Sequence, residues 1–155
     1  MSDSFEVRVV WPADESQKMP PDPAFSRNNW LASPGKPEIG GSSPVAFGGD
    51  PKRYNPEELL MLALSECHLL TYLAMAAKRK IKVVHYDDNA TGQLGKNAAG
   101  KMQMMEVVLH PRVTVAKGTD LEEARALHAR AHENCFIANS VNFVVRNEPE
   151  IIEHN

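Results

Sequence analysis

The sequence predicts one α+β domain over residues 1–155, in which strands precede and follow a long helix. Three observations lead to this prediction. A chain of 155 residues suits one domain of ordinary size. Its middle contains a long apolar segment without Gly or Pro, residues 57–80, which is typical of a buried helix. Segments with the alternation or β-branched residues of strands stand on both sides of this helix.

The first third of the chain predicts a strand followed by loops. Residues 5–11 alternate large apolar with polar residues, which is the period of a half-buried strand. Eight of the eleven prolines and five of the nine glycines fall within residues 12–55. We therefore expect loops and short strands there, with one strand over residues 25–31.

The long helix is predicted to begin at Asn55. Asn55 is a good cap, Pro56 suits the first helical position because no donor is needed there, and Glu58 can close a capping box. Leu, Ala and Met then occupy nearly every face, so the helix should be buried on most sides. The basic residues 78–80 suit its C-terminal end.

The second half of the chain predicts further strands and one more helix. We expect a strand over residues 81–86, a turn or flexible loop over 89–100, and β-structure over 102–115, which Pro111 splits or confines to an edge. Two overlapping capping boxes in residues 119–123 open a second helix, whose apolar or small face reaches Cys135. Residues 141–145 complete the order as a final strand.

Charge and hydropathy exclude several classes of protein. The net charge of −3 gives no basic surface for nucleic acid. Glu66 and His68 interrupt the longest apolar run, so no membrane span is expected. The start Met1-Ser2-Asp3-Ser4 lacks the basic-then-apolar order of a signal peptide, which predicts a cytoplasmic protein.

The two cysteines, Cys67 and Cys135, have three interpretations. Each lies on the packing face of a predicted helix, so both can be inert structural thiols. His128, His132 and Cys135 also share one helical face, and with Cys67-His68 they form a candidate zinc set. Adjacent helical residues diverge by about 100°, which disfavours Cys67 and His68 as ligands of one ion. The third interpretation is thiol redox chemistry, which needs the two sulfurs to meet.

The sequence around both cysteines resembles the OsmC/Ohr family (osmotically inducible protein C and organic hydroperoxide resistance protein). The first block is Asn55-Pro56-Glu57-Glu58-Leu59-Leu60 followed by Ser65-Glu66-Cys67-His68. The second is residues 132–141, which surround Cys135, and residues 25–27 and 48–51 also resemble the family. The resemblance covers roughly residues 25–145. Glu66 beside Cys67 and Phe136 after Cys135 depart from the family's usual pattern and indicate a divergent branch.

The resemblance implies an intertwined homodimer, with antiparallel sheets around a long central helix and active sites at the subunit interface. It implies a thiol-dependent peroxidase without cofactor or metal, which reduces organic hydroperoxides and is reset by an external dithiol. Cys67 would form a sulfenic acid and then a disulfide with Cys135. The alternative function is a non-catalytic redox-sensing or small-ligand-binding protein of the same fold.

The resemblance also implies roles for charged residues. Glu57 matches the family's site glutamate, and Arg27 is our choice for its arginine, with Arg53 as the rival. A guanidinium would favour the reactive Cys67 thiolate, because Cys67 lies too far into its helix for the N-terminal dipole to help. Ten helical residues separate Glu57 from Cys67 by ~15 Å along the axis. The site is therefore expected to be completed across the dimer interface, or the helix to break near residues 60–64.

Overall fold

The structure is a computed structural model that describes residues 3–155. Met1 and Ser2, on which the expectation about a signal peptide partly rests, lie outside the described residues. The chain forms two compact units, the first ending at Leu59 and the second spanning Leu60–Asn155. The single domain expected over residues 1–155 stays a prediction.

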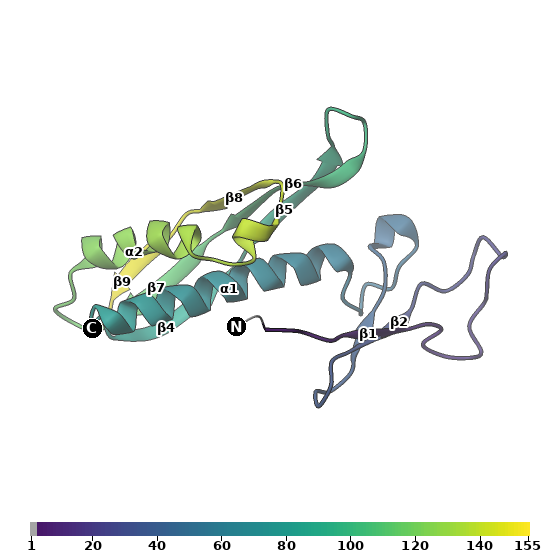
Figure 1. The fold of residues 1–155 in the computed structure, drawn as a ribbon, viewed down its shortest axis with the longest axis horizontal. Helices are drawn as coiled ribbons and strands as arrows, with labels where there is room; N and C mark the ends of the chain where they lie inside the picture. Colours follow the sequence, from purple (N-terminus) through teal and green to yellow (C-terminus); the bar gives the residue numbers. More distant parts are fainter. Residues whose placement is uncertain (1–2) are drawn as a thin grey trace. The chain divides into compact units, whose positions relative to one another are not determined.

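The first unit contains a small antiparallel sheet, which Figure 1 shows in purple and blue. Its strands are β1 (Arg8–Val10), β2 (Asn29–Ala32) and β3 (Ile39–Gly41), in the order β1-β2-β3. A single 3-10 turn, η1 (Val45–Phe47), follows them. The strands expected over residues 5–11 and 25–31 are confirmed in part, because β1 is shorter than expected and β2 begins later. The Pro- and Gly-rich remainder connects them as predicted.

The second unit contains most of the regular structure (Figure 1). The long helix α1 (Pro56–Lys78) enters it from the first unit, and a second helix, a 3-10 turn and six strands follow. These elements are β4 (Val83–Asp88), β5 (Thr91–Lys96), β6 (Met102–Leu109), β7 (Pro111–Val115), α2 (Leu121–Glu133), η2 (Ala138–Ser140), β8 (Val144–Asn147) and β9 (Glu150–Glu153). The α+β class predicted from the sequence is confirmed.

The strands of the second unit form two three-stranded sheets, in the orders β4-β7-β9 and β5-β6-β8. In each sheet one pair is antiparallel, as expected, and the other is parallel. His110 separates β6 from β7, and β7 starts at Pro111. The expected effect of Pro111 is therefore confirmed, because the β-structure over residues 102–115 is split there.

Strand β5 replaces the loop expected over residues 89–100, so that prediction is wrong. The loop was expected because Gly92 and Gly95 fall in this segment and glycines are typical of turns. Both lie within β5, which pairs with β6. A Cβ atom on Gly92 would come within 2.7 Å of the Met61 Sδ atom. The strand therefore passes close to the Met61 and Met104 side chains at Gly92, so this glycine reflects packing rather than a turn.

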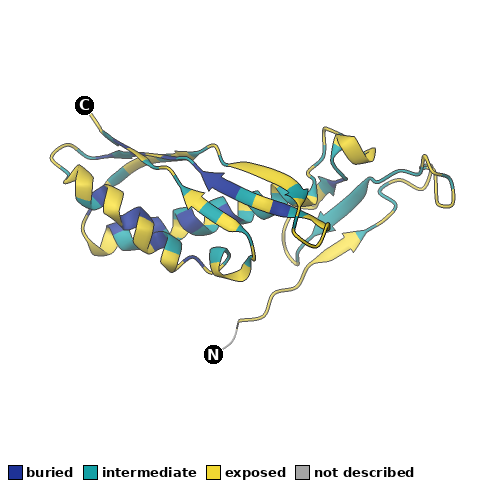
Figure 2. Ribbon diagram, turned by 90° about the horizontal axis from the view of Figure 1, so that it is seen from above, coloured by how far each residue is buried: buried dark blue, intermediate teal, exposed yellow. Residues whose placement is uncertain are grey.

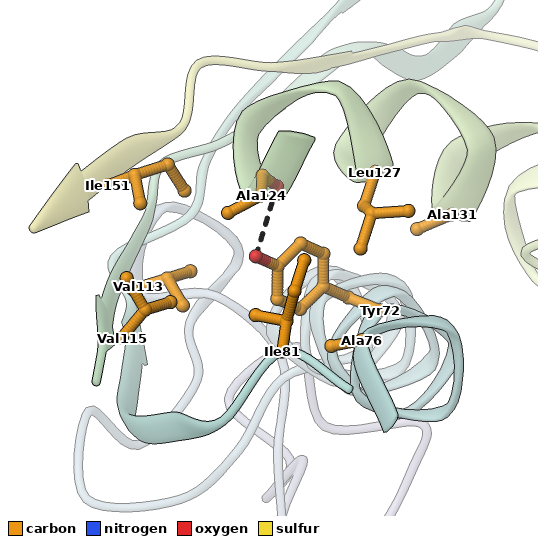
Figure 3. Packing of buried hydrophobic residues seen from close by; sticks show 9 residues of the cluster. All are labelled: Tyr72, Ala76, Ile81, Val113, Val115, Ala124, Leu127, Ala131 and Ile151. Atoms are coloured by element: carbon orange, nitrogen blue, oxygen red, sulfur yellow. Dashed lines mark hydrogen bonds between the residues drawn. The ribbon is translucent and has the colours of Figure 1, made fainter. Parts of the chain in front are cut away.

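Helices α1 and α2 pack together through an apolar cluster, which Figure 3 shows from close by. Tyr72 is fully buried at its centre, and its hydroxyl donates a hydrogen bond of 3.0 Å to the Ala124 carbonyl oxygen. The cluster is completed by side chains from both helices, from β7 and β9, and from the segment after α1: Ala76, Ile81, Val113, Val115, Leu127, Ala131 and Ile151. A second cluster joins α1 to β6 through Leu64, Met104, Val107 and Leu109.

Only one stripe of α1 is buried within the chain, as the alternating colours in Figure 2 show. Its buried residues recur every fourth position: Leu64, His68, Tyr72 and Ala76. Leu62 and Leu70 are more than half exposed, so the prediction that the helix is buried on most sides is wrong for a single chain. By length and apolar composition α1 could also cross a membrane, and the expectation that Glu66 and His68 exclude this is wrong.

Candidate active site

Helix α1 carries Cys67, and its start forms as the sequence predicts. The Asn55 side chain accepts a hydrogen bond of 2.8 Å from the Glu58 amide, and the Glu58 carboxylate accepts one of 3.1 Å from the Asn55 amide. This is the expected capping box. The helix then runs without interruption from Pro56 to Lys78, so the expected break near residues 60–64 is wrong.

Cys135 lies just beyond α2 rather than on it. The helix ends at Glu133 and Asn134 is its C-cap, which corrects the prediction that the helical face reaches Cys135. The Cys135 amide donates to the His132 carbonyl oxygen, and the Ala138 amide donates to the Cys135 sulfur at 3.5 Å. These contacts hold the sulfur at the start of the turn that leads into η2.

The structure brings the two thiols together within the second unit. Both cysteines are free, Cys67 is half-buried and Cys135 is fully buried. Burial and, next, the neighbouring Cys67 thiol together raise the pKa of the Cys135 thiol to about 11. At neutral pH the Cys135 thiol therefore keeps its proton and can donate it to the Cys67 sulfur. The Cys67 thiol is near enough to act on the pKa of Cys135, and neighbouring thiols of this kind can form a disulfide on oxidation.

The charged residues that the sequence singled out belong to the first unit. Arg27 donates a hydrogen bond of 2.7 Å to the Phe25 carbonyl oxygen and lies over the Phe25 ring at 4.3 Å. Arg53 forms an ion pair with Asp50 at 3.7 Å, donates to the Asn29 carbonyl oxygen and lies over the Trp30 ring. Arg53 thus already has a carboxylate partner, whereas the ion pairs of residues 3–155 include none for Arg27.

Glu57 has an unused hydrogen-bond acceptor, and Arg27 lies beside open space. One carboxylate oxygen of Glu57, Oε2, is buried without a hydrogen-bond partner. Arg27 also lines an open pocket of about 390 Å³ in the first unit, together with Trp11, Phe25 and Pro56. Arg27 and Glu57 belong to the first unit and Cys67 belongs to the second. That the two charged residues act together on Cys67 therefore stays a prediction.

Two buried histidines are the feature that sequence reasoning missed. His68 Nε2 and His128 Nδ1 lie 2.9 Å apart, and the His128 ring stacks on Tyr72 with centroids 4.1 Å apart. His68 is therefore a hydrogen-bonded packing residue, and His128 is buried with it rather than exposed on a polar face of α2. The sequence feature that could have predicted the burial of His128 is its position between Ala124 and Ala131, on the small-residue face of α2.

Burial governs the charge of this pair. Desolvation lowers the pKa of His68 to about 4 and that of His128 to about 3, and nearby positive charge acts in the same direction. Both imidazoles are therefore neutral at physiological pH. Among residues 3–155, no group of three or more His, Cys, Asp or Glu side chains is arranged to hold a metal ion, so the zinc set of His128, His132 and Cys135 is not assembled.

Comparison with known proteins identifies the family. The family model described as OsmC-like protein matches residues 49–148, about two thirds of the chain. The protein belongs to the OsmC-like family. The resemblance stated from the sequence is thereby confirmed, and the matched part contains Arg53, Glu57, Cys67 and Cys135 but not Arg27. The comparison with curated proteins found no match.

Solved structures of OsmC-like proteins share this fold. An OsmC-like protein of unknown function from Vibrio cholerae is 36% identical, with a TM-score of 0.88 over 96% of this chain and 100% of that one. An organic hydroperoxide resistance protein OsmC from Legionella pneumophila is 20% identical, with a TM-score of 0.70 and 97% of each chain covered. An organic hydroperoxide resistance protein from Elizabethkingia anophelis is 22% identical, with a TM-score of 0.70 over 99% of this chain and 100% of that one.

Proposed function

We propose that this OsmC-like protein is a thiol-dependent peroxidase that reduces organic hydroperoxides. The observation that carries the proposal is that the free thiols of Cys67 and Cys135 are neighbours, near enough for Cys67 to raise the pKa of Cys135. Organic hydroperoxide resistance proteins of the same fold support the choice of substrate. The apolar residues that surround Cys67 on α1 favour an organic hydroperoxide over hydrogen peroxide.

The different environments of the two thiols support their roles. Cys67 is the more accessible of the two, so its thiolate attacks the terminal peroxide oxygen, the O–O bond breaks and the alkoxide leaves as an alcohol after it takes a proton. The product is a Cys67 sulfenic acid. The Cys135 sulfur then displaces water from it and forms the Cys67–Cys135 disulfide. An external dithiol supplies two electrons and two protons, restores both thiols and is itself oxidised to a disulfide.

Arg27 and Glu57 complete the proposed site. Arg27 is the better candidate than Arg53 for favouring the Cys67 thiolate, because Arg53 is already paired with Asp50. Glu57 would hold the Arg27 guanidinium, and its unpartnered carboxylate oxygen is consistent with this task. Since α1 is unbroken, we propose that Arg27 and Glu57 of one subunit serve the Cys67 of a second subunit.

The surface of α1 supports such a homodimer. Leu62, Glu66, Leu70 and Ala74 follow one another at intervals of four and are all exposed. Apart from Glu66 this exposed stripe is apolar, and such a stripe on a long helix is suited to burial against a second copy of the chain. Leu70→Asp should therefore shift the protein to monomers, whereas Arg112→Asp on the exposed part of β7 should not. Analytical ultracentrifugation measures both, and a monomeric wild type would contradict the dimer.

The protein is proposed to act in the cytoplasm, where thiols are kept reduced. Proteins of this family are soluble, and the apolar stripe of α1 is accounted for by the proposed dimer. A net charge of −3 argues against nucleic acid as a partner.

Consumption of an alkyl hydroperoxide in the presence of a dithiol reductant tests the proposed function. Cys67→Ser should abolish turnover, and Cys135→Ser should stop it after one turnover with a sulfenic acid that dimedone traps. Arg27→Gln should slow the attack of Cys67 more than Arg53→Gln does. Unchanged turnover in Cys67→Ser would refute the mechanism. A disulfide that forms without sustained turnover would favour the alternative, a redox-sensing protein.

A further inference from the structure

The second unit contains an open pocket of about 430 Å³ that the thiol chemistry does not use. It lies between α2 and the segment that leads from β8 into β9, elements that run side by side in Figure 1. The polar residues that line it are Arg125, His128 and His132 from α2, Arg146 and Asn147 from β8, and Glu148. Its volume falls in the range of small-molecule sites.

Two polar atoms on residues that line this pocket are buried and have no hydrogen-bond partner within residues 3–155. They are His128 Nε2 and Asn147 Oδ1, and they come from two different elements. The His128 side chain is only 2% exposed. A polar molecule in the pocket would supply the partners that buried polar atoms usually have.

The contact with His68 determines what His128 offers to this molecule. His128 Nδ1 faces His68 Nε2 at 2.9 Å, so His128 Nε2 lies on the opposite side of the ring. Both imidazoles are neutral, so each ring carries one N–H proton. One of these two protons lies in the hydrogen bond between the rings. When His68 donates this proton, His128 must carry its own at Nε2. An acceptor in the pocket therefore selects the arrangement in which His128 is a donor.

The charge of the pocket makes this acceptor an anion. Arg146 is paired with Glu106 at 2.6 Å and with Glu148 at 3.0 Å. Arg125 instead donates to the Pro149 carbonyl oxygen at 2.7 Å, and the ion pairs found within residues 3–155 leave its charge without a carboxylate. Asn147 Oδ1, in contrast to the Arg125 and His128 N–H groups, accepts hydrogen bonds, so the ligand must also offer it a donor.

We propose that this pocket binds a small hydroxycarboxylate. The carboxylate accepts hydrogen bonds from Arg125 and from His128 Nε2–H, and the hydroxyl donates to Asn147 Oδ1. The negative charge of the ligand opposes the effects that lower the pKa of His128, so binding raises this pKa. The site is independent of the peroxidase reaction, and its test does not measure turnover.

Glycolate is the probe, and NMR of the imidazole nitrogens is the measurement. Glycolate should shift the His128 signals in a saturable way, raise the pH at which His128 titrates, and bind more tightly than acetate, which lacks the hydroxyl. Arg125→Gln removes an exposed side chain and should weaken binding about tenfold or more, the effect of losing a charged hydrogen bond. Arg112→Gln, an exposed arginine on β7, is the matched control and should leave binding unchanged.

Asn147→Val provides a second variant that keeps the charge of the pocket. It should reduce the preference for glycolate over acetate to about one, because only the hydroxyl contact is lost. The proposal is overturned if glycolate causes no shift beyond that of sodium chloride at equal ionic strength. Equal affinity in wild type and Arg125→Gln, or equal binding of acetate and glycolate to wild type, overturns it as well.

Discussion

The interface between α1 and α2 has two ends of opposite character. At one end Tyr72 packs among aliphatic and small side chains and stacks on the His128 ring, which joins this end to the other, and its hydroxyl is satisfied by the Ala124 carbonyl (Figure 3). At the other end the two thiols meet, and the His68–His128 pair keeps an unpartnered nitrogen on each ring. Because buried polar groups without partners cost free energy, the first end stabilises the helix pair and the second is available for chemistry.

This division explains how reactive groups can be buried without loss of the fold. Apolar burial at the Tyr72 end offsets the cost of desolvating the histidines, which are held neutral. The comparison predicts that changes at the Tyr72 end alter stability at every pH. Changes at the histidine end should alter mainly the response to acid.

Tyr72→Ala should have the largest effect on stability. Removing a fully buried aromatic side chain leaves a cavity and should lower the free energy of unfolding by about 3–5 kcal/mol. Tyr72→Phe loses only the hydrogen bond to Ala124 and should cost about 1 kcal/mol. Urea unfolding followed by circular dichroism measures both. Phe136→Ala is the control, because Phe136 is 81% exposed, and an equal loss there would contradict the assigned core.

Acid should act on the histidine end. Folding lowers the pKa of His68 to about 4 and that of His128 to about 3, so the unfolded chain takes up protons at a higher pH than the folded one. Stability is therefore full above about pH 6.5 and falls as the pH is lowered toward 4, by about 3 kcal/mol for His68 alone.

The double variant His68→Leu/His128→Leu tests the origin of this acid response. Its free energy of unfolding should change much less between pH 7 and pH 4 than that of the wild type, whatever its absolute stability. His154→Leu removes an exposed histidine and should keep the wild-type dependence. If the double variant loses as much stability on acidification as the wild type, the buried pair is not the cause.

The sequence predicted elements with strong local signals and missed features set by tertiary contacts. The capping box of Asn55 and Glu58 identified the start of α1, and Pro111 marked the division between β6 and β7. Gly92 hid strand β5, because its closeness to the Met61 and Met104 side chains is visible only in the fold. The two cysteines could be placed on packing faces, but their contact depends on how α1 and α2 approach each other.

The histidine pair was hidden for the same reason. Helical spacing allows His128 on either a polar or a packing face, and His68 looks like any polar residue that interrupts an apolar run. Their hydrogen bond joins residues 60 positions apart in the chain, so only the packed helices reveal it. Local patterns thus predict elements, whereas the pairing of polar groups between elements needs the fold.

Lys80 should have the smallest effect, at the Tyr72 end of the interface. It lies two residues beyond the end of α1 with a φ of 58°, and the amides of Lys80 and Ile81 donate to the carbonyl oxygens of Ala77 and Ala76, respectively, in a Schellman motif. Since this left-handed conformation favours glycine, Lys80→Gly should raise the free energy of unfolding by about 0.5–1 kcal/mol. Lys82→Gly, on a neighbouring exposed position outside that conformation, should lower it instead. Urea unfolding of both variants measures the difference, and a loss of stability in Lys80→Gly would show that the lysine side chain itself supports the apolar end.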